Sequence, residues 1–247
     1  GGFMRLRNNP DAMPFLEEQA DLVFINPRDH LGKWHEVFGN NNPIAIEIGM
    51  GKGDFIIENA RRNPDINYIG IEKYSTVLTI AVKKYLEMEA LPNLRFMKED
   101  AAVLGEVFAE NEIDTVYLNF SVPWPKKRHL KRRLTYASFL DVYKNILKEK
   151  GHLIFKTDNR PFFEYSLVSM NNYGAFTRLL FGLNKTLRIA GQVIPIYRDS
   201  KPLVKNVYNF VKKKNNKVIS NNTSKEISKP EEKKKIIVSN NNPTFFI

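Results

Sequence analysis

The sequence predicts an α/β fold built on a doubly wound, mostly parallel sheet with helices on both faces. Between residue 43 and about residue 183, short apolar runs alternate with longer helical runs, which is typical of parallel strands joined by crossover helices. A turn with three glycines directly follows the first apolar run, a place where backbone N–H groups can approach a ligand. The 247 residues, of which 43% are hydrophobic, can close one sizeable core.

The strands and helices are expected in a regular order. The first helix should begin near Asp54, whose carboxylate can cap free N–H groups, and should end before Pro64. The second should run from a cap at Ser75 through Leu86, and a later helix over 136–148 should be closed by Gly151. The expected strands are 44–48, 68–72, 94–98, 115–120 and 152–156, followed by strand-like runs at 176–183 and 192–197.

Composition divides the chain into an extension, a folded domain and a tail. Residues 1–42 are expected to be an N-terminal extension, of which 1–3 look like an artificial addition ahead of Met4. The domain should cover 43–200, and 201–247 should be a loosely ordered tail. Eleven lysines and three glutamates give this tail +8 of the net charge of +11. Such a tail adds nonspecific affinity for phosphate groups, although an AT-rich genome would also produce a tail rich in lysine and asparagine.

Several classes of protein are disfavoured by what the sequence lacks. No apolar run approaches the ~20 residues that a membrane span needs, and the N-terminus has no secretory pattern. A cytoplasmic protein, a monomer or a homodimer, is therefore expected. The absence of cysteine and the scatter of four histidines leave no metal-ligand spacing, so metal-free chemistry is expected.

The glycine-rich turn favours a methyl donor over a dinucleotide. Gly49, Gly51 and Gly53 fall as G-x-G-x-G, whereas a dinucleotide turn needs G-x-G-x-x-G. The position of that last glycine is Asp54, so a pyrophosphate cradle and a nicotinamide oxidoreductase are disfavoured. Glu47 could hold an α-amino group, which S-adenosylmethionine carries.

Two further carboxylates follow the next two expected strands. Glu72 ends the second strand and can accept both hydroxyls of a ribose, and Asp100 follows the third and can accept from an exocyclic amine such as that of adenine. Either acid alone would more often be a solvated residue at a strand end. Three acids at the ends of three strands, where open sheets collect ligands, favour a cofactor site.

A basic loop after the fourth strand is the most specific segment of the chain. Pro123 and Pro125 should stiffen it, and Trp124 could pack or stack there. Residues 126–133 contain six lysine or arginine residues and no acid, a composition that favours phosphate contacts. A solvated basic helix start would have a similar composition.

The chain resembles the bacterial tRNA (guanine-N7-)-methyltransferase family from about Met4 to Tyr173, and more loosely to Arg198. The matching stretches are 4–7, 32–34, 38–39, 47–53, 68–72, 117–121, 123–135 and 155–160. The resemblance implies a class I, Rossmann-like methyltransferase fold with a seven-stranded sheet, in which 43–200 are the methyltransferase domain. It also implies S-adenosylmethionine as the cofactor and tRNA as the partner.

The resemblance further implies methylation of guanine N7 in the variable loop of tRNA. Guanine N7 has an in-plane lone pair, so the reaction needs no strong base, nucleophilic side chain or metal; alignment and nearby negative charge suffice. The expected cofactor-binding residues are Glu47, Gly49, Gly51, Gly53, Glu72, Asp100 and Asn119, and the expected substrate-binding residues are Lys126, Arg128, Arg132 and Asp158.

Two departures from the family pattern lie on the substrate side. The family reads Ser-Asp-Pro-Trp-Pro with a catalytic aspartate, but that position here is Val122. The family's Thr-Glu-Tyr-Glu segment is also absent, since 182–192 hold no acid. Asp158 could partly replace the lost carboxylate. The alternatives are therefore a weakened or inactive tRNA-binding relative and a methyltransferase of another substrate class.

Overall fold

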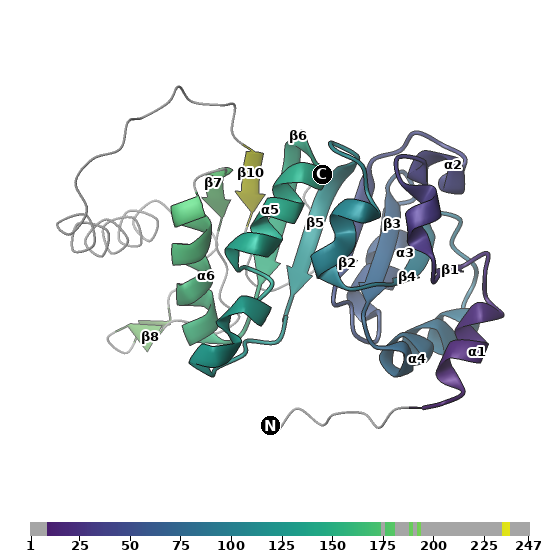
Figure 1. Ribbon diagram of the computed structural model, residues 1–247, viewed down its shortest axis with the longest axis horizontal. Helices are drawn as coiled ribbons and strands as arrows, with labels where there is room; N and C mark the ends of the chain where they lie inside the picture. Colours follow the sequence, from purple (N-terminus) through teal and green to yellow (C-terminus); the bar gives the residue numbers. More distant parts are fainter. Residues whose placement is uncertain (1–8, 174–175, 181–187, 190–191, 194–233, 238–247) are drawn as a thin grey trace.

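A computed structural model describes residues 9–173, 176–180, 188–189, 192–193 and 234–237. These residues form an eight-stranded sheet in the order β1-β4-β3-β2-β5-β6-β10-β7, and every pair of neighbours is parallel (Figure 1). A separate antiparallel pair is formed by β8 (Arg188–Ile189) and β9 (Gln192–Val193). The strands of the large sheet are β1 (Val23–Phe24), β2 (Ile44–Ile48), β3 (Asn67–Glu72), β4 (Leu94–Lys98), β5 (Ile113–Asn119), β6 (Leu147–Lys156), β7 (Phe176–Leu180) and β10 (Lys234–Ile237).

Helices cover both faces of this sheet, which confirms the predicted doubly wound arrangement. The α-helices are α1 (Ala12–Glu17), α2 (Trp34–Phe38), α3 (Asp54–Arg62), α4 (Ser75–Leu86), α5 (Ala137–Ile146) and α6 (Arg160–Tyr173), and the 3-10 helices are η1 (Pro27–His30), η2 (Ala101–Glu106) and η3 (Lys127–Arg132). One buried cluster joins α1, α3 and α4 to one face of the sheet, and a second cluster joins α2, η2, α5 and α6 to the other. The central strands β2 and β3 are buried on both sides, as is typical of parallel sheets.

The expected count of seven strands is wrong. Six of the expected strands are present in the sheet, and β1 and β10 are additional. The two residues of β1 are too few to show a period of two, and β10 lies in the lysine-rich tail, where hydrophobic alternation is weak. Of the expected strand 192–197, Gln192 and Val193 pair only with β8, and 194–197 lie outside the described residues.

The end of one helix also differs from the sequence-based expectation. The helix expected to reach residue 148 ends at Ile146, because Leu147 already opens β6 and is fully buried opposite Ile113. Gly151 therefore lies inside β6 and stops no helix. A Cβ atom there would lie 2.8 Å from the Lys148 carbonyl oxygen, so glycine permits a close backbone approach.

The N-caps of two helices next to the site lie one residue earlier than expected, although α3 begins at Asp54 as predicted. Tyr74, not Ser75, is the N-cap of α4, and Gly53 precedes Asp54 at the start of α3. The Asp54 carboxylate pairs with the Lys84 ammonium of α4. Both shifts follow from the paths of the turns that enter these helices, which residue type alone does not specify.

Residues of the expected N-terminal extension contribute to the core. Ala12 and Leu16 are fully buried, and Leu16 belongs to the cluster around α3 and α4. Trp34 is fully buried on the other face, where its indole Nε1–H donates to the Val107 carbonyl oxygen at 2.9 Å. The carboxylate of Glu112 accepts from the backbone N–H of Trp34 at 3.2 Å. The extension is thus anchored on both faces of the sheet.

Candidate active site

The turn between β2 and α3 has an unusual backbone. Gly49, Gly51 and Gly53 have φ of +72°, +58° and +76°, a region in which L side chains are strained. A Cβ atom on Gly49 or Gly51 would meet no atom within 4 Å. The glycines are therefore needed for the path of the backbone, and the space above the turn is open to a ligand.

A close contact between Met50 and Gly70 sets the distance between the glycine-rich turn and β3. Met50 is 6% exposed, and a Cβ atom on Gly70 of β3 would lie 2.3 Å from the Met50 sulfur. The backbone N–H groups of Gly49 and Met50 both donate to the Ile71 carbonyl oxygen, at 2.9 and 3.1 Å. The absence of a side chain at Gly70 thus lets the turn pack down onto β3.

Glu47 on β2 is a buried carboxyl group with one free oxygen. It is 2% exposed; Oε1 accepts from the Asn119 side-chain amide at 2.9 Å, while Oε2 has no partner among the described residues. Burial raises the pKa of Glu47 to about 8, against the opposing hydrogen bond from Asn119. A buried acceptor of this kind fits a cationic amino group, because such a group would pair with Oε2 and favour the ionised form.

Glu72 at the end of β3 holds the turn in place. Its carboxylate accepts from the backbone N–H groups of Gly51 at 3.1 Å and Tyr74 at 3.0 Å. Burial raises the pKa of Glu72, although these backbone hydrogen bonds oppose the shift. Each carboxylate oxygen has a second lone pair, so the predicted binding of ribose hydroxyls remains compatible with this structural role.

Asp100 follows β4 and is already paired. One oxygen accepts from the Ala102 backbone N–H at 3.0 Å, and the other lies 2.5 Å from the Lys73 ammonium. Burial opposes ionisation, but the hydrogen bonds and the Lys73 charge outweigh it and hold the pKa of Asp100 below its usual value. Lys73, at the end of the neighbouring strand, was not foreseen as part of this site.

The structure places the two loops of the expected substrate side at the same edge of the sheet. Asn119 of β5 is the register partner of Lys156 of β6, so Val122 and Asp158 each lie within three residues of neighbouring strand ends. The side chains of Val122 and Asp158 are both exposed. Val122 offers no charge to a substrate, and Asp158 is the carboxylate that follows β6.

The basic loop joins an exposed arginine-rich surface to a buried arginine. Lys126, Arg128 and Arg132 are exposed, and the Arg132 guanidinium lies 5.1 Å from the centroid of the Trp124 ring. Arg133 is 7% exposed and donates to the Trp124 carbonyl oxygen at 3.2 Å. Its guanidinium also lies 4.2 Å from the centroid of the Tyr165 ring. Within a run of six basic residues, nothing in the sequence singles out Arg133 as the buried one.

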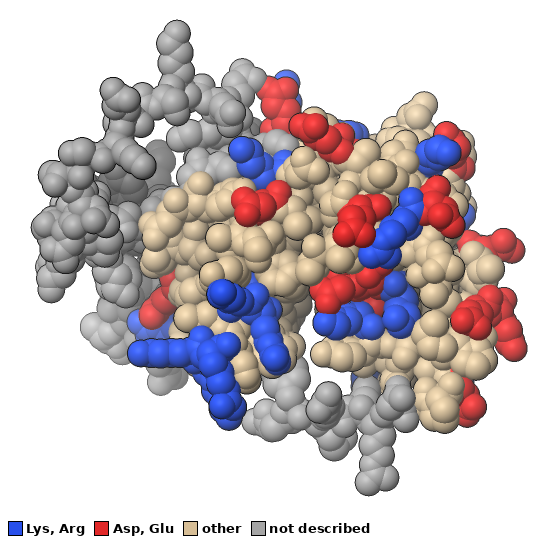
Figure 2. Space-filling model, viewed as in Figure 1, with Lys and Arg blue, Asp and Glu red and all other residues tan. Residues whose placement is uncertain are grey.

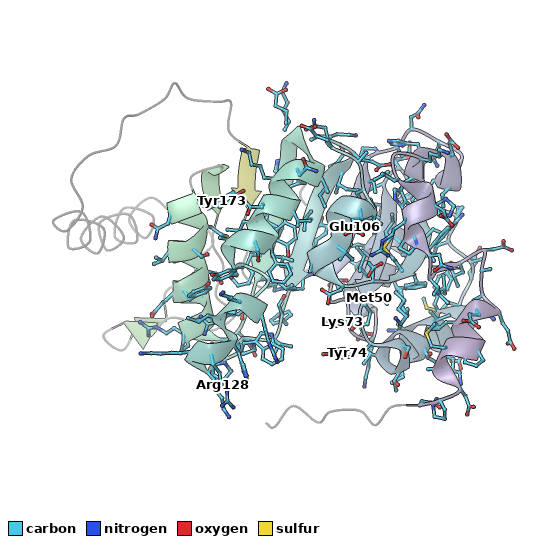
Figure 3. All side chains as sticks on the ribbon, in the orientation of Figure 1. Met50, Lys73, Tyr74, Glu106, Arg128 and Tyr173 are labelled. Atoms are coloured by element: carbon cyan, nitrogen blue, oxygen red, sulfur yellow. The ribbon has the colours of Figure 1, made fainter. Side chains whose placement is uncertain are left out.

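The molecule is hollowed at the carboxyl ends of the strands. Figure 2 shows this hollow at the lower centre, with lysine and arginine side chains on both walls and acidic side chains on one of them. Lys73 and Tyr74 lie on one side of the opening and Arg128 on the other (Figure 3). The glycine-rich turn and the basic loop therefore lie at the same end of the sheet.

The residues that the structure describes contain neither a metal-ligand cluster nor a membrane-spanning helix. There, no three histidine or acidic side chains cluster as they would around a metal ion. No helix among the same residues combines the length and the apolar character that crossing a bilayer needs.

Comparisons with known proteins identify methyltransferases among the relatives of this chain. A family model described as "Putative methyltransferase" matches residues 41–182. A tRNA (guanine-N(7)-)-methyltransferase of Geobacillus sp. (strain WCH70) is 56% identical over 171 residues, which cover 69% of this chain and 77% of that protein. One of Bacillus cytotoxicus is 53% identical over 197 residues, covering 79% and 90%. A solved structure of an antibiotic-related methyltransferase is 21% identical to this chain, with a TM-score of 0.45. The match covers 58% of this chain and 73% of that protein.

The order of the parallel strands, the helices on both faces and the open turn beside Glu47 define an S-adenosylmethionine-dependent methyltransferase of class I. The family model covers more than half of the chain, and the Geobacillus relative is matched over more than two thirds of its length. The chain belongs to the tRNA (guanine-N(7)-)-methyltransferase family, as its resemblance predicted.

Proposed function

We propose that this chain transfers a methyl group from S-adenosylmethionine to N7 of a guanine in tRNA, in the variable loop as the family resemblance implies. The observation that carries the proposal is that the end of β5 contacts the expected cofactor site and also leads into the basic loop. Asn119, the last residue of that strand, donates to Glu47, and the basic loop begins directly after it. Donor and RNA would therefore meet at one strand end.

The residues around the turn fit S-adenosylmethionine. We expect Glu47 to hold the α-ammonium group through its unpartnered oxygen, and Glu72 to accept from the ribose hydroxyls. Asp100 would accept from the adenine amine, while Lys73 keeps that carboxylate ionised and oriented. The open space above Gly49 and Gly51 leaves room for the group between these acids.

The reaction requires little acid–base catalysis by the protein. When bound, S-adenosylmethionine supplies a methyl group on a sulfonium, and guanine N7 accepts it with its lone pair without losing a proton. The chain would contribute alignment of the two reactants and negative charge near the purine as it becomes cationic. At the substrate side, Asp158 is the carboxylate that could fill the second role, since Val122 cannot.

The exposed basic residues fit contacts with the RNA backbone. We expect Lys126, Arg128 and Arg132 to contact phosphates, because they lie on one loop at the mouth of the site and lack acidic neighbours in sequence. Arg132 would remain stacked on Trp124 and so present its charge from a fixed position. We further propose that the protein works in the cytoplasm as a monomer or a homodimer.

The second candidate is a weakened or inactive tRNA-binding relative. Val122 is the observation that favours it, since the expected aspartate is missing. The relatives at 53% and 56% identity are named as methyltransferases and give this alternative no support.

One assay tests both candidates. Purified protein is mixed with bulk tRNA and S-adenosylmethionine labelled in its methyl group, and label in the tRNA is counted. We expect incorporation by the chain as written and a loss of incorporation in Lys126→Ala/Arg128→Ala, whose affinity for S-adenosylhomocysteine should stay unchanged. Incorporation by Val122→Asp alone would support the inactive relative, and no tRNA binding at low salt would contradict both candidates.

A further inference from the structure

Phe120 has a strained backbone at the centre of the site. Its φ is +49°, in the left-handed region that bulky side chains disfavour. The strained position is held by a hydrogen bond from its own backbone N–H to the Lys156 carbonyl oxygen at 2.7 Å. Next to it, Ser121 Oγ is buried without a partner among the described residues. Local costs of this kind concentrate at functional sites.

The strain at Phe120 does not serve the hydrophobic core. The residue is 45% exposed, among the most exposed of the large apolar residues in the described part of the chain. The Lys156 ammonium lies 5.3 Å from the ring centroid, on one face. Almost half of the residue is accessible to solvent, so a planar partner can reach the ring. An exposed ring that also requires a strained backbone has no evident advantage for stability.

The position of the ring matches the point of methyl transfer. Phe120 directly follows Asn119, the last residue of β5, whose side chain donates to Glu47. The strand β5 lies between β2 and β6 in the sheet (Figure 1). The glycine-rich turn follows β2 and Asp158 follows β6. Phe120 is therefore placed between the cofactor side and the substrate side.

Two other aromatic residues near the hollow fit a stacking role less well. Trp124 also has a positive φ, +42°, but its ring contacts two side chains, Arg132 at 5.1 Å and His129 at 5.4 Å between ring centroids, whereas one cation contacts the Phe120 ring. Tyr74 is exposed but belongs to the start of α4 on the cofactor side, where its φ of −94° is unstrained.

We infer that Phe120 is the surface on which the target guanine stacks during methyl transfer. This inference rests on the proposed function. An enzyme that modifies a base must remove it from its stack, and unstacked bases bind to aromatic side chains. The π face of the ring also attracts positive charge, which the purine gains as N7 is methylated. The ring would thus bind the base and favour its charged product.

The variant Phe120→Gly distinguishes an effect on methyl transfer from an effect on folding. In Phe120→Gly the relief of the strained positive φ offsets the greater freedom of glycine in the unfolded chain, so the thermal midpoint should change little. The kcat/KM for tRNA should fall by about five- to a hundredfold, the range expected for loss of one base–aromatic stack. Phe120→Tyr keeps an aromatic face and should retain kcat/KM within about twofold. Both variants should bind S-adenosylhomocysteine with unchanged affinity.

Asn111→Gly is the matched control. Asn111 also has a positive φ, +58°, but it precedes β5 at the opposite end of the strand. We expect this variant to retain full kcat/KM. Unchanged kcat/KM in Phe120→Gly, or an equal loss in Asn111→Gly, would overturn the inference. A parallel loss of S-adenosylhomocysteine affinity in Phe120→Gly would overturn it too. Failure of the unmodified chain to methylate tRNA would instead refute the proposed function itself, and the inference with it.

Discussion

The charge of the Glu47 carboxyl group depends on the burial of this residue. Its pKa of about 8 means that much of this carboxyl is protonated at neutral pH before a ligand arrives. An amino-group cation binds the ionised form better, so binding and loss of the proton are linked. The affinity for S-adenosylhomocysteine should rise by roughly twentyfold between pH 6 and pH 7.5, measured by calorimetric titration. In Glu47→Gln this rise should vanish; if it persists, another group controls the pH dependence.

The same raised pKa has a consequence for stability. The unfolded chain loses this proton near the usual glutamate value, whereas the folded chain keeps it up to about pH 8. The contribution of Glu47 to stability is thus fully present below about pH 4.5 and declines as pH rises to 8. Thermal midpoints should show Glu47→Gln gaining on the unmodified protein over this range. A constant difference would contradict the assigned pKa.

Val122 is the residue at which activity could be increased. Its side chain is 36% exposed, so a carboxylate can be introduced without burying a charge. Val122→Asp should raise the rate of tRNA methylation by about tenfold or more, since one oriented electrostatic group commonly contributes 10²–10³. Val122→Asn is the uncharged control, and an equal gain in both variants would show that polarity rather than charge is responsible.

At the level of elements, the packing of the turn on β3 should control cofactor affinity. A methyl group at residue 70 would lie 2.3 Å from the Met50 sulfur, so in Gly70→Ala the buried Met50 side chain must move, which disturbs the packing of the turn that carries it. We expect weaker binding of S-adenosylhomocysteine and a free energy of unfolding lower by about 1–3 kcal/mol. Gly105→Ala, whose new Cβ would meet nothing within 4 Å, should change neither quantity. Equal effects in both variants would contradict the role given to the turn.

The loop after β5 depends on one buried arginine. In Arg133→Lys, the hydrogen bond to the Trp124 carbonyl and the stacking on Tyr165 are weakened, although the charge remains. We expect a loss of about 1–2 kcal/mol in urea unfolding and a higher KM for tRNA. Arg132→Lys, at an exposed position, should leave the unfolding free energy nearly unchanged. If it destabilises the protein equally, the loop is not held by Arg133.

Over the whole molecule, the features that the sequence predicted correctly are those that depend on residues close together in the chain. The strands β2, β3 and β4 are short runs of five or six residues in which apolar side chains recur, and Glu47 and Glu72 lie within or at the end of such runs. Their placement follows once the sheet is parallel. The short strand β1 and the strand β10 in the lysine-rich tail show no such pattern and were missed.

Features that depend on contacts between distant segments were not predictable. The Glu72 carboxylate binds the Gly51 N–H across 21 positions, and the link from Glu47 to Asn119 spans 72. Neither pairing has a local signal. The positive φ of Phe120 and the burial of Arg133 likewise arise from the path of the loop between β5 and α5. Such features emerge only when the strand ends are brought together.

The identity of the methylated atom tests the central claim most directly. After incubation with S-adenosylmethionine, tRNA is digested to nucleosides, and each methylated nucleoside is identified by mass spectrometry against standards. Methyl transfer by this chain should yield N7-methylguanosine, located in the variable loop by sequencing. No methylated nucleoside, or a methyl group on another atom, would contradict the assignment of this site to guanine N7.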